Sequence, residues 1–268
     1  MSVVFTDLDG TMLNNDSIVS EYTKNVIREM LRTGHKLVLS SGRPLPSVLE
    51  VKEKAGLDFP NMYVIAFNGC IIYDCDKKEM IRTVRVPRKI LKEVWELAGE
   101  RDLHIQTYTD DSIVVPEMDN EIAFYTRLIH MDTEVTTDPA TTLKDEPYKM
   151  LAISLDDRKK IEAFRDEVVD KYGDELAVFF SNNWYLEMFK KESGKGSAVK
   201  WMCEHFGVPL ADSYAFGDEM NDESMLLAAG HGIAMKNSNP NLFASADEIS
   251  EYTNHEDGFA KYIEKHIL

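Results

Sequence analysis

Two aspartates near the amino terminus are the first residues that could do chemistry. Asp7 and Asp9 lie in the segment DLDGT at residues 7–11, directly after the apolar run Val3–Thr6, which predicts a short buried strand. If the strand stays extended as far as Asp9, both carboxylates point to the same side. Like charges this close repel unless a cation or a shared proton separates them, so the pair predicts a metal site.

Two other interpretations of this segment can be weighed at once. A surface turn also fits, because Asp-Gly is a common turn dipeptide. A calcium loop of the EF-hand type does not fit. A loop starting at Asp7 would have Met12 where the tight-turn glycine belongs and Ile18 where the bidentate glutamate belongs.

A second acidic segment, GDEMND at residues 217–222, follows the apolar residues 214–216 and precedes a predicted helix. Both acidic segments thus lie at strand-to-helix turns of one sheet, where they could converge on a single hard cation with oxygen ligands. Ordinary helix capping by Asp218 is the simpler interpretation. Capping explains one aspartate but not the whole set, which also includes Asn221.

Lys195 lies in the segment SGKGS at residues 193–197, at the start of a predicted helix. Flanking glycines and a helix N-terminus favour an anion, to which the ammonium adds a point charge. The segment is not a P-loop, which would need a hydroxyl at Gly196, directly after the lysine. Taken alone, it is better explained as a solvated lysine in a flexible turn.

Residues 41–43, Ser-Gly-Arg, follow a second apolar strand. Ser41 supplies a hydroxyl, Gly42 an accessible N–H group and Arg43 a guanidinium, all of which donate to phosphate oxygens. In isolation, a turn with a surface arginine explains this segment equally well.

The elements that must position these residues alternate between strand and helix. Ser20 predicts the N-cap of a helix that has an apolar face and ends at Gly34. Strands at 35–39 and 62–67 flank a helix at 44–55, and the alternation returns at the carboxyl end with helices at 197–206 and 221–228, strands at 213–216 and 232–235, and a last helix ending near Ile267. This pattern predicts an α/β fold with a Rossmann-like, doubly wound parallel sheet.

The middle of the chain has a different pattern. Residues 71–73 and 80–86 predict a hairpin, followed by helices at 88–98, 117–129 and 157–172 and strands at 103–108, 112–115, 149–155, 176–181 and 184–189, with a polar stretch rich in Thr and Asp before residue 149. Paired strands between helices indicate a separate α+β unit on an antiparallel sheet. We expect a catalytic core at 1–82 and 188–268 and an inserted cap at 83–187, of about 100 residues.

Composition limits the function. The chain has 268 residues, 44% of them hydrophobic, and a net charge of −17, which argues against a nucleic-acid binder and against an anionic membrane surface. Three cysteines are too few for a disulfide framework or a paired zinc site. There is no basic leader and no apolar run near the roughly 18 residues of a membrane span, so we expect an unprocessed cytoplasmic protein. No pattern in the sequence indicates an oligomeric state.

Together the four polar segments resemble the four motifs of the haloacid dehalogenase superfamily, and most closely its Cof-type phosphatases with a C2 cap of the C2B type. The matches are Asp7-x-Asp9-Gly10-Thr11, Ser41, Lys195 and Gly217-Asp218-x-x-Asn221-Asp222. Their order and the insert between the second and third motifs also agree. Ser41 stands where the family often has Thr, and Lys236 replaces a usually small residue.

The resemblance implies a mechanism. Asp7 would be the nucleophile, forming an aspartyl-phosphate that water hydrolyses, and Asp9 would act as general acid and then base. The carboxylates of Asp7 and Asp218 and the backbone carbonyl of Asp9 would hold Mg²⁺, with Asp222 orienting its waters.

The resemblance also implies how the phosphoryl group is held. Ser41, Lys195, Asn221 and the N–H groups around Gly42 would bind its oxygens, and Arg43 would reach the remainder of the substrate. The implied function is a Mg²⁺-dependent phosphomonoester hydrolase for small phosphorylated metabolites such as sugar phosphates. The alternatives are a phosphomutase on the same scaffold and a non-catalytic sensor of phosphometabolites, for which a lost motif carboxylate would be expected.

Overall fold

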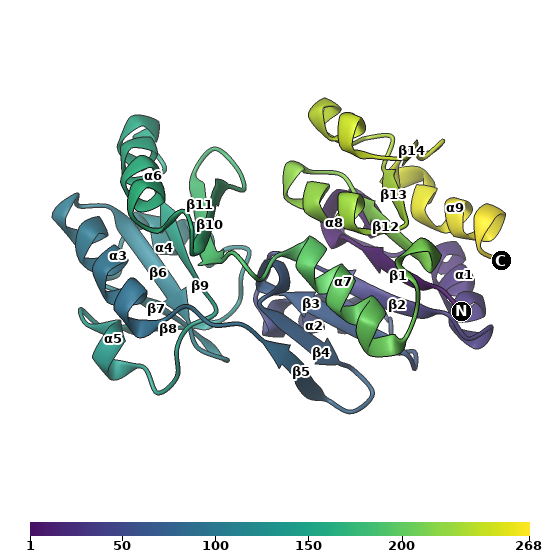
Figure 1. Ribbon diagram of the computed structural model, residues 1–268, viewed down its shortest axis with the longest axis horizontal. Coiled ribbons are helices and arrows are strands. Elements are labelled where there is room, and N and C mark those ends of the chain that lie inside the picture. Colours follow the sequence, from purple (N-terminus) through teal and green to yellow (C-terminus); the bar gives the residue numbers. More distant parts are fainter. The chain divides into compact units, whose positions relative to one another are not determined.

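The computed structural model describes all 268 residues, which divide into two compact units (Figure 1). Unit 1 consists of Met1–Gly42, Val48–Arg82 and Gly194–Leu268, and unit 2 of Arg43–Ser47 and Thr83–Ser193. Each unit has its own sheet and its own apolar core. No helix combines the length and apolar character that crossing a bilayer requires.

Unit 1 is built on an eight-stranded sheet with the order β14-β13-β12-β1-β2-β3-β4-β5. Neighbouring strands from β14 to β3 are parallel, and β3 pairs with β4 in the antiparallel sense. The strands are β1 (Val3–Thr6), β2 (Lys36–Ser40), β3 (Met62–Ala66), β4 (Ile71–Asp74), β5 (Glu79–Thr83), β12 (Ser213–Gly217), β13 (His231–Ala234) and β14 (Glu248–Ile249). The predicted α/β fold with a mainly parallel sheet is confirmed.

Helices cover both faces of this sheet. They are α1 (Glu21–Arg32), α7 (Lys195–Phe206), α8 (Glu223–Ala228) and α9 (Gly258–His266), while α2 (Leu45–Lys54) begins in the short segment that belongs to unit 2. Ala215 of β12 joins the core formed with α7 and α8. The next residue, Phe216, points to the opposite face and packs its ring against Phe259 and Tyr262 of α9. This alternation follows from the two-residue period of a strand.

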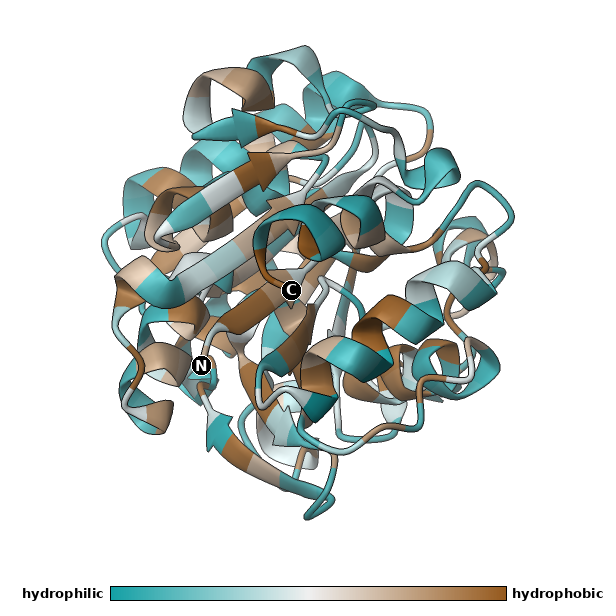
Figure 2. Ribbon diagram, turned by 90° about the vertical axis from the view of Figure 1, so that its right-hand side faces the viewer, coloured by the Kyte–Doolittle hydropathy of each residue, from teal (hydrophilic) through white to brown (hydrophobic).

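Apolar patterning explains these positions. In Figure 2, brown apolar stretches recur along the strands and on one side of the helices. Helix α1 shows the cause: the Ser20 side chain accepts a hydrogen bond from the Thr23 N–H at 3.0 Å, and the apolar face at residues 26, 27, 30 and 31 is buried. The predicted N-cap and buried face of this helix are confirmed.

The first strand has the predicted bounds, Val3–Thr6, but the extended backbone does not continue to Asp9. β1 stops at Thr6, and Leu8–Met12 forms a kinked helical turn in which Gly10 has a φ of 79°. The expectation that extended backbone to Asp9 would align the two carboxylates is therefore wrong. The Asp7 N–H still donates to the Phe216 carbonyl of β12 at 3.0 Å, and the chain leaves the sheet after this residue.

Unit 2 contains a six-stranded sheet with the order β10-β11-β9-β6-β7-β8. Its strands are β6 (His104–Tyr108), β7 (Ser112–Val115), β8 (Asp132–Val135), β9 (Lys149–Ile153), β10 (Leu176–Phe180) and β11 (Tyr185–Lys190), and its helices are α3 (Arg88–Glu100), α4 (Asn120–Tyr125), α5 (Pro139–Thr142) and α6 (Arg158–Tyr172). The sheet is mixed, because β7 and β8 are parallel while the other pairs are antiparallel. The fully antiparallel sheet expected here is thus wrong at its edge.

Two local predictions in unit 2 also differ from the structure. The helix expected at 117–129 covers only Asn120–Tyr125, and it begins there because the Asp119 carboxylate caps it by accepting from the Ile122 N–H. The polar stretch rich in Thr and Asp contains β8 and α5. Residues of β8 are mostly exposed, so the strand is specified by pairing with β7 and leaves no apolar alternation in the sequence.

The two faces of the unit 2 sheet differ in character. One face packs apolar side chains against α3 and α6. The other carries buried polar groups, including Lys149, whose ammonium lies 2.6 Å from the Glu187 carboxylate, and a hydrogen-bonded row of Gln106, Tyr108 and Tyr125. Such a pair is tolerated in the interior because each charge has a partner.

Candidate active site

Three strand ends of unit 1 bring the predicted residues to one edge of the sheet. β1 lies between β12 and β2, with Thr6 opposite both Phe216 and Leu39. Asp7 therefore follows β1 beside the start of the 217–222 segment, and Ser41 follows β2, where its N–H donates to the Ile65 carbonyl at 2.8 Å. Carboxyl ends of parallel strands are where open α/β sheets place their ligands.

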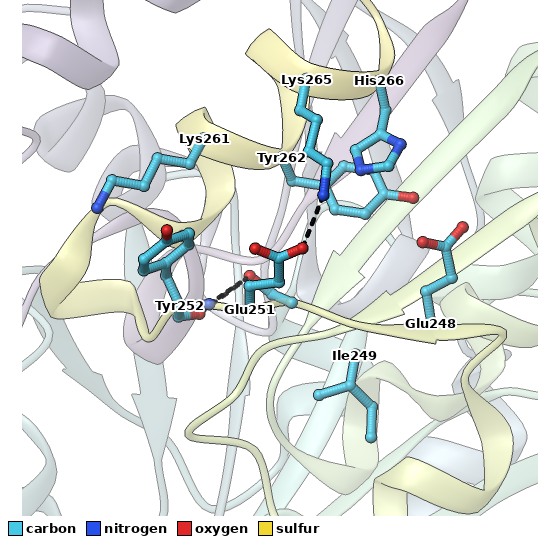
Figure 3. A pocket seen from close by; sticks show the side chains of 10 residues that line it. Glu248, Ile249, Glu251, Tyr252, Lys261, Tyr262, Lys265 and His266 are labelled. Carbon is cyan, nitrogen blue, oxygen red and sulfur yellow. Dashed lines mark hydrogen bonds and ion pairs between the residues drawn. The ribbon is translucent and has the colours of Figure 1, made fainter.

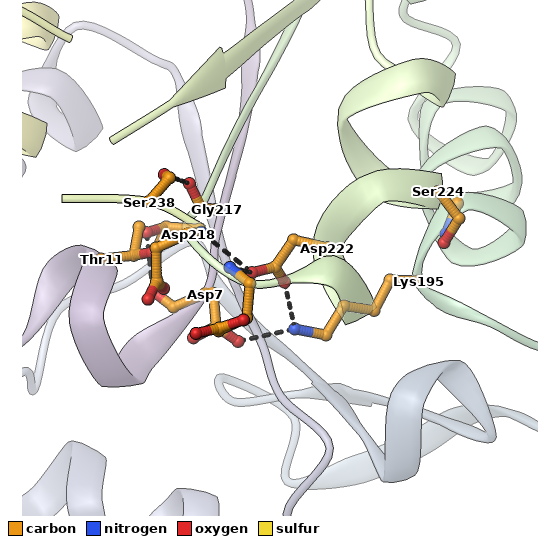
Figure 4. Close-up of polar contacts among 11 residues, drawn as sticks. Asp7, Thr11, Lys195, Gly217, Asp218, Asp222, Ser224 and Ser238 are labelled. Atoms are coloured by element: carbon orange, nitrogen blue, oxygen red, sulfur yellow. Dashed lines mark hydrogen bonds and ion pairs between the residues drawn. The ribbon is translucent and has the colours of Figure 1, made fainter. Parts of the chain in front are cut away.

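Lys195 is the centre of the polar contacts at this edge (Figure 4). It is the first residue of α7, preceded by Gly194 with a φ of 116°, and its side chain is 1% exposed. Its ammonium donates to Asp7 Oδ1 at 2.6 Å and to Asp222 Oδ1 at 2.5 Å. The interpretation as a solvated lysine in a flexible turn is therefore wrong.

Asp222 holds the second acidic segment in shape. Its Oδ1 accepts a hydrogen bond from the Lys195 ammonium, and its Oδ2 accepts hydrogen bonds from the N–H groups of Asp218 and Glu219, at 3.1 and 3.2 Å. It ends the short helical turn η4 (Met220–Asp222) that leads into α8. Every oxygen of this buried carboxylate is thus committed to groups of the protein.

Asp218 does not cap a helix. Glu219 and Asp222 occupy the N-cap positions of η4 and α8, whereas Asp218 Oδ1 accepts a hydrogen bond from the Thr11 hydroxyl at 2.7 Å. The capping interpretation of Asp218 is therefore wrong. Thr11 links the two acidic segments directly, and this role was not among the roles predicted from sequence.

The three carboxylates form one buried acidic cluster. Potential ligand oxygens of Asp7, Asp218 and Asp222 all lie within 4.8 Å of one another. Burial raises the pKa of Asp7 well above its usual range, opposed by the charge of Lys195, and burial raises the pKa of Asp218 to about 7. Burial would lower the pKa of Lys195, but the charges of Asp222 and Asp7 outweigh it and raise that pKa. One ammonium against three carboxylates leaves negative charge that a cation would offset.

Two glycines make room for these carboxylates. A Cβ atom at Gly10 would lie 2.2 Å from Asp218 Oδ2, and one at Gly217 would lie 2.4 Å from the Asp222 Cβ. Neither approach is possible for a residue with a side chain unless the carboxylate moves. The glycines are thus part of the site because the carboxylates pack against bare backbone.

Other predicted residues are not members of the acidic cluster. Asp9 is exposed and contributes no side-chain ligand to the cluster, while Gly42 and Asn221 are half-buried. Arg43 belongs to unit 2, so its role stays a prediction from sequence. Asn237 was not predicted, yet its Nδ2 donates to the Gly10 carbonyl at 2.8 Å and so holds the turn.

A separate surface cavity of about 110 Å³ lies between β14 and α9 (Figure 3). Lys265 and Glu251 form an ion pair of 2.7 Å across it, and Lys261 lies over the Tyr252 ring. None of the predicted site residues lines this cavity. Its position at the edge of the sheet separates it from the carboxyl ends of β1 and β12.

Comparison with known proteins agrees with this geometry. The family model of haloacid dehalogenase-like hydrolases matches residues 4–263. The chain belongs to this family.

Relatives of this haloacid dehalogenase-like hydrolase match over the full length. The 5-amino-6-(5-phospho-D-ribitylamino)uracil phosphatase YwtE of Bacillus subtilis is 28% identical, with 99% of this chain and 98% of the relative covered. A haloacid dehalogenase-like hydrolase of Bacteroides thetaiotaomicron superposes with a TM-score of 0.87 at 28% identity, covering 98% of each chain. A subclass IIB sugar phosphatase superposes with a TM-score of 0.80 at 20% identity and 99% and 98% coverage, which shows the shared fold. The protein is a phosphatase of the haloacid dehalogenase-like family.

Proposed function

We propose that this phosphatase is a Mg²⁺-dependent phosphomonoester hydrolase that works through an aspartyl-phosphate on Asp7. The observation that carries the proposal is the placement of the Asp7 carboxylate, which lies at the end of β1, 2.6 Å from the buried Lys195 ammonium. In its ionised form a carboxylate can split phosphoryl transfer into two easier steps. Lys195 favours that ionised form against the opposing effect of burial.

The donor set of the acidic cluster fits Mg²⁺. Asp7 and Asp218 each use one oxygen in a hydrogen bond, to Lys195 and Thr11, and each keeps a second oxygen without a hydrogen bond. Asp222 uses both of its oxygens within the protein. This division supports Asp7 and Asp218 as direct ligands, together with the Asp9 carbonyl, and Asp222 as a residue that positions them. When bound, Mg²⁺ would supply positive charge that offsets the charge of the phosphoryl oxygens.

The protein's own groups account for the remaining chemistry. In the first step Asp7 forms a bond to phosphorus as the ester P–O bond breaks, and Asp9 gives its proton to the departing oxygen. In the second step water attacks the same phosphorus, Asp9 takes the proton of that water, and Asp7 is released with inorganic phosphate. Ser41, Gly42, Lys195 and Asn221 would hold the phosphoryl oxygens through both steps.

We further propose small phosphorylated metabolites as substrates, with sugar phosphates first. The chain between 83 and 187 would be the cap that selects the leaving group, on a core at 1–82 and 188–268. The relative YwtE is a phosphatase of 5-amino-6-(5-phospho-D-ribitylamino)uracil, which supports adding a ribityl phosphate to the candidates. Arg43 would contact the part of the substrate beyond the phosphate.

The test is phosphate release from sugar phosphates, nucleotides, flavin mononucleotide and pyridoxal phosphate, with Mg²⁺ or with EDTA. We expect turnover of a few members that disappears with EDTA. The variant Asp7→Asn should lose turnover while circular dichroism shows an intact fold, and the control Asp16→Asn, at an exposed position, should keep it. Substantial hydrolysis by Asp7→Asn would remove Asp7 as nucleophile. Phosphoryl transfer only between sugars, with a bisphosphate activator, would instead identify a mutase.

A further inference from the structure

The turn that follows β3 has an unusual backbone. Phe67, Asn68 and Gly69 have φ values of 49°, 57° and 108°, three left-handed residues in succession. Such a conformation is costly for residues with a side chain, and most of all for a bulky one. A strained turn persists only where its surroundings hold it in place.

One side of this turn contacts the loop that follows β2. The Asn68 N–H donates to the Ser41 carbonyl at 3.0 Å. The Asn68 side chain is 3% exposed and lies against Gly42, where a Cβ atom would come 2.9 Å from Asn68 Oδ1. A side chain at position 42 would therefore collide with the Asn68 carboxamide.

The other side of the turn contacts the start of α7. A Cβ atom at Gly69 would lie 2.5 Å from the Gly194 carbonyl oxygen and 2.8 Å from its nitrogen. Gly194 directly precedes Lys195. The turn thus lies between the two segments that carry Ser41 and Lys195, and it touches the backbone of both.

Stability does not explain an asparagine at this position. Asn68 Oδ1 is buried and has no hydrogen-bond partner, and an unpaired buried acceptor costs free energy. Glycine would adopt the same backbone conformation without that cost. What the asparagine adds over glycine is a carboxamide packed on Gly42.

We propose that Asn68 is a positioning residue of the phosphoryl site, which holds the Ser41–Gly42 loop at a fixed distance from Lys195. The proposal rests on the proposed function, in which Ser41, Gly42 and Lys195 bind the phosphoryl oxygens. Donors must be fixed in place before the charge arrives to be effective. Asn68 does so through its main-chain bond to Ser41 and through the carboxamide that limits the movement of Gly42.

The test compares Asn68→Gly with Asn61→Gly in the full-length protein. Asn61 also has a left-handed φ, of 63°, and lies at the opposite end of β3. Both changes relax the backbone, but only Asn68→Gly removes the carboxamide next to Gly42. The probes are inorganic phosphate, titrated by calorimetry with saturating Mg²⁺, and p-nitrophenyl phosphate for steady-state kinetics.

We expect Asn68→Gly to melt no lower than the parent protein. Its Kd for phosphate and its KM should both rise about tenfold, with a much smaller change in kcat, because lost binding common to ground and transition states acts on KM. Asn61→Gly should change neither. Asn68→Asp keeps the shape but places a carboxylate beside the phosphate donors, and should weaken phosphate binding further.

Several outcomes would overturn the proposal. One is unchanged phosphate Kd and KM in Asn68→Gly. Another is a variant Asn68→Gly that unfolds while Asn68→Asp binds phosphate as the parent does, which would show a purely structural role. Phosphate binding needs no turnover, so a parent protein that binds phosphate but hydrolyses nothing refutes the hydrolase alone, whereas a parent that binds no phosphate refutes both.

Discussion

The substitution Gly10→Ala tests whether bare backbone at the kinked turn is what permits the acidic cluster. A new Cβ would lie 2.2 Å from Asp218 Oδ2 and 3.0 Å from Oδ1. Since the three atoms nearest to this Cβ all belong to the Asp218 side chain, the Asp218 carboxylate is the group that has to move. Its movement would break the 2.7 Å hydrogen bond from Thr11.

The expected loss has two parts. Placing alanine at a φ of 79° costs about 1–2 kcal/mol in the free energy of unfolding. Losing a hydrogen bond to a charged acceptor costs about 1.5–3 kcal/mol. We therefore expect Gly10→Ala to lower the free energy of unfolding by about 2.5–5 kcal/mol, the sum of these two ranges.

Gly207→Ala is the matched control. Gly207 has a φ of 65° at the end of α7, and a Cβ there would meet nothing within 4 Å. The control should show only the backbone cost of about 1–2 kcal/mol. The difference between the two variants then measures the clash with Asp218.

The assays are urea unfolding in EDTA and in saturating Mg²⁺, and calorimetric titration with Mg²⁺. Because a displaced ligand weakens the metal, Mg²⁺ affinity should fall about 10–100-fold in Gly10→Ala and stay unchanged in Gly207→Ala. Mg²⁺ should accordingly stabilise Gly10→Ala less than the parent protein. Equal losses of stability in the two variants, with equal Mg²⁺ affinities, would refute the reasoning.

Two further predictions concern buried charges. Lys149→Met leaves the Glu187 carboxylate buried without its partner and should lower the free energy of unfolding by about 3–5 kcal/mol, whereas the double variant Lys149→Met/Glu187→Leu should recover most of it in urea unfolding; equal losses in both would contradict the ion-pair explanation. In EDTA, burial raises the pKa of Asp218 to about 7, above its unfolded value of about 3.9. Between these two pH values the folded protein binds a proton on Asp218 that the unfolded chain has lost, so the free energy of unfolding falls as pH rises from about 4 to about 7. Mg²⁺ affinity should rise over the same window because the metal competes with the proton, and Asp218→Asn should flatten the pH dependence of stability; an unchanged profile in that variant would assign the titration to another group.

Elements with strong apolar patterns followed from the sequence. The buried face of α1 recurs with the helical period, and Ser20 supplies its cap, so local physics and packing agree. Strands that are held mainly by hydrogen bonds to a neighbouring strand could not be predicted from the sequence. β8 and β14 lie at sheet edges and are mostly exposed, and their hydrogen bonds to a neighbouring strand leave no alternation of apolar residues to detect.

The candidate site divides in the same way. Residue types and their order along the chain were enough to single out Asp7, Lys195, Asp218 and Asp222, because chemistry at a strand end needs those functional groups. Sequence could not show that Lys195 is buried between Asp7 and Asp222, or that Thr11 reaches Asp218.

The sequence by itself therefore determined which groups are present, where the strands that carry them end, and which family they resemble. Only the tertiary structure decided which carboxylate oxygen accepts from each donor, which carboxylates share one cluster, and which residues, such as Asn68, contact the loops that carry the site. The physical reason is that Thr11 and Asp218 are 207 positions apart and Asp7 and Lys195 188 apart, so their contacts arise from the packing of separate elements, and no local pattern of residues encodes them.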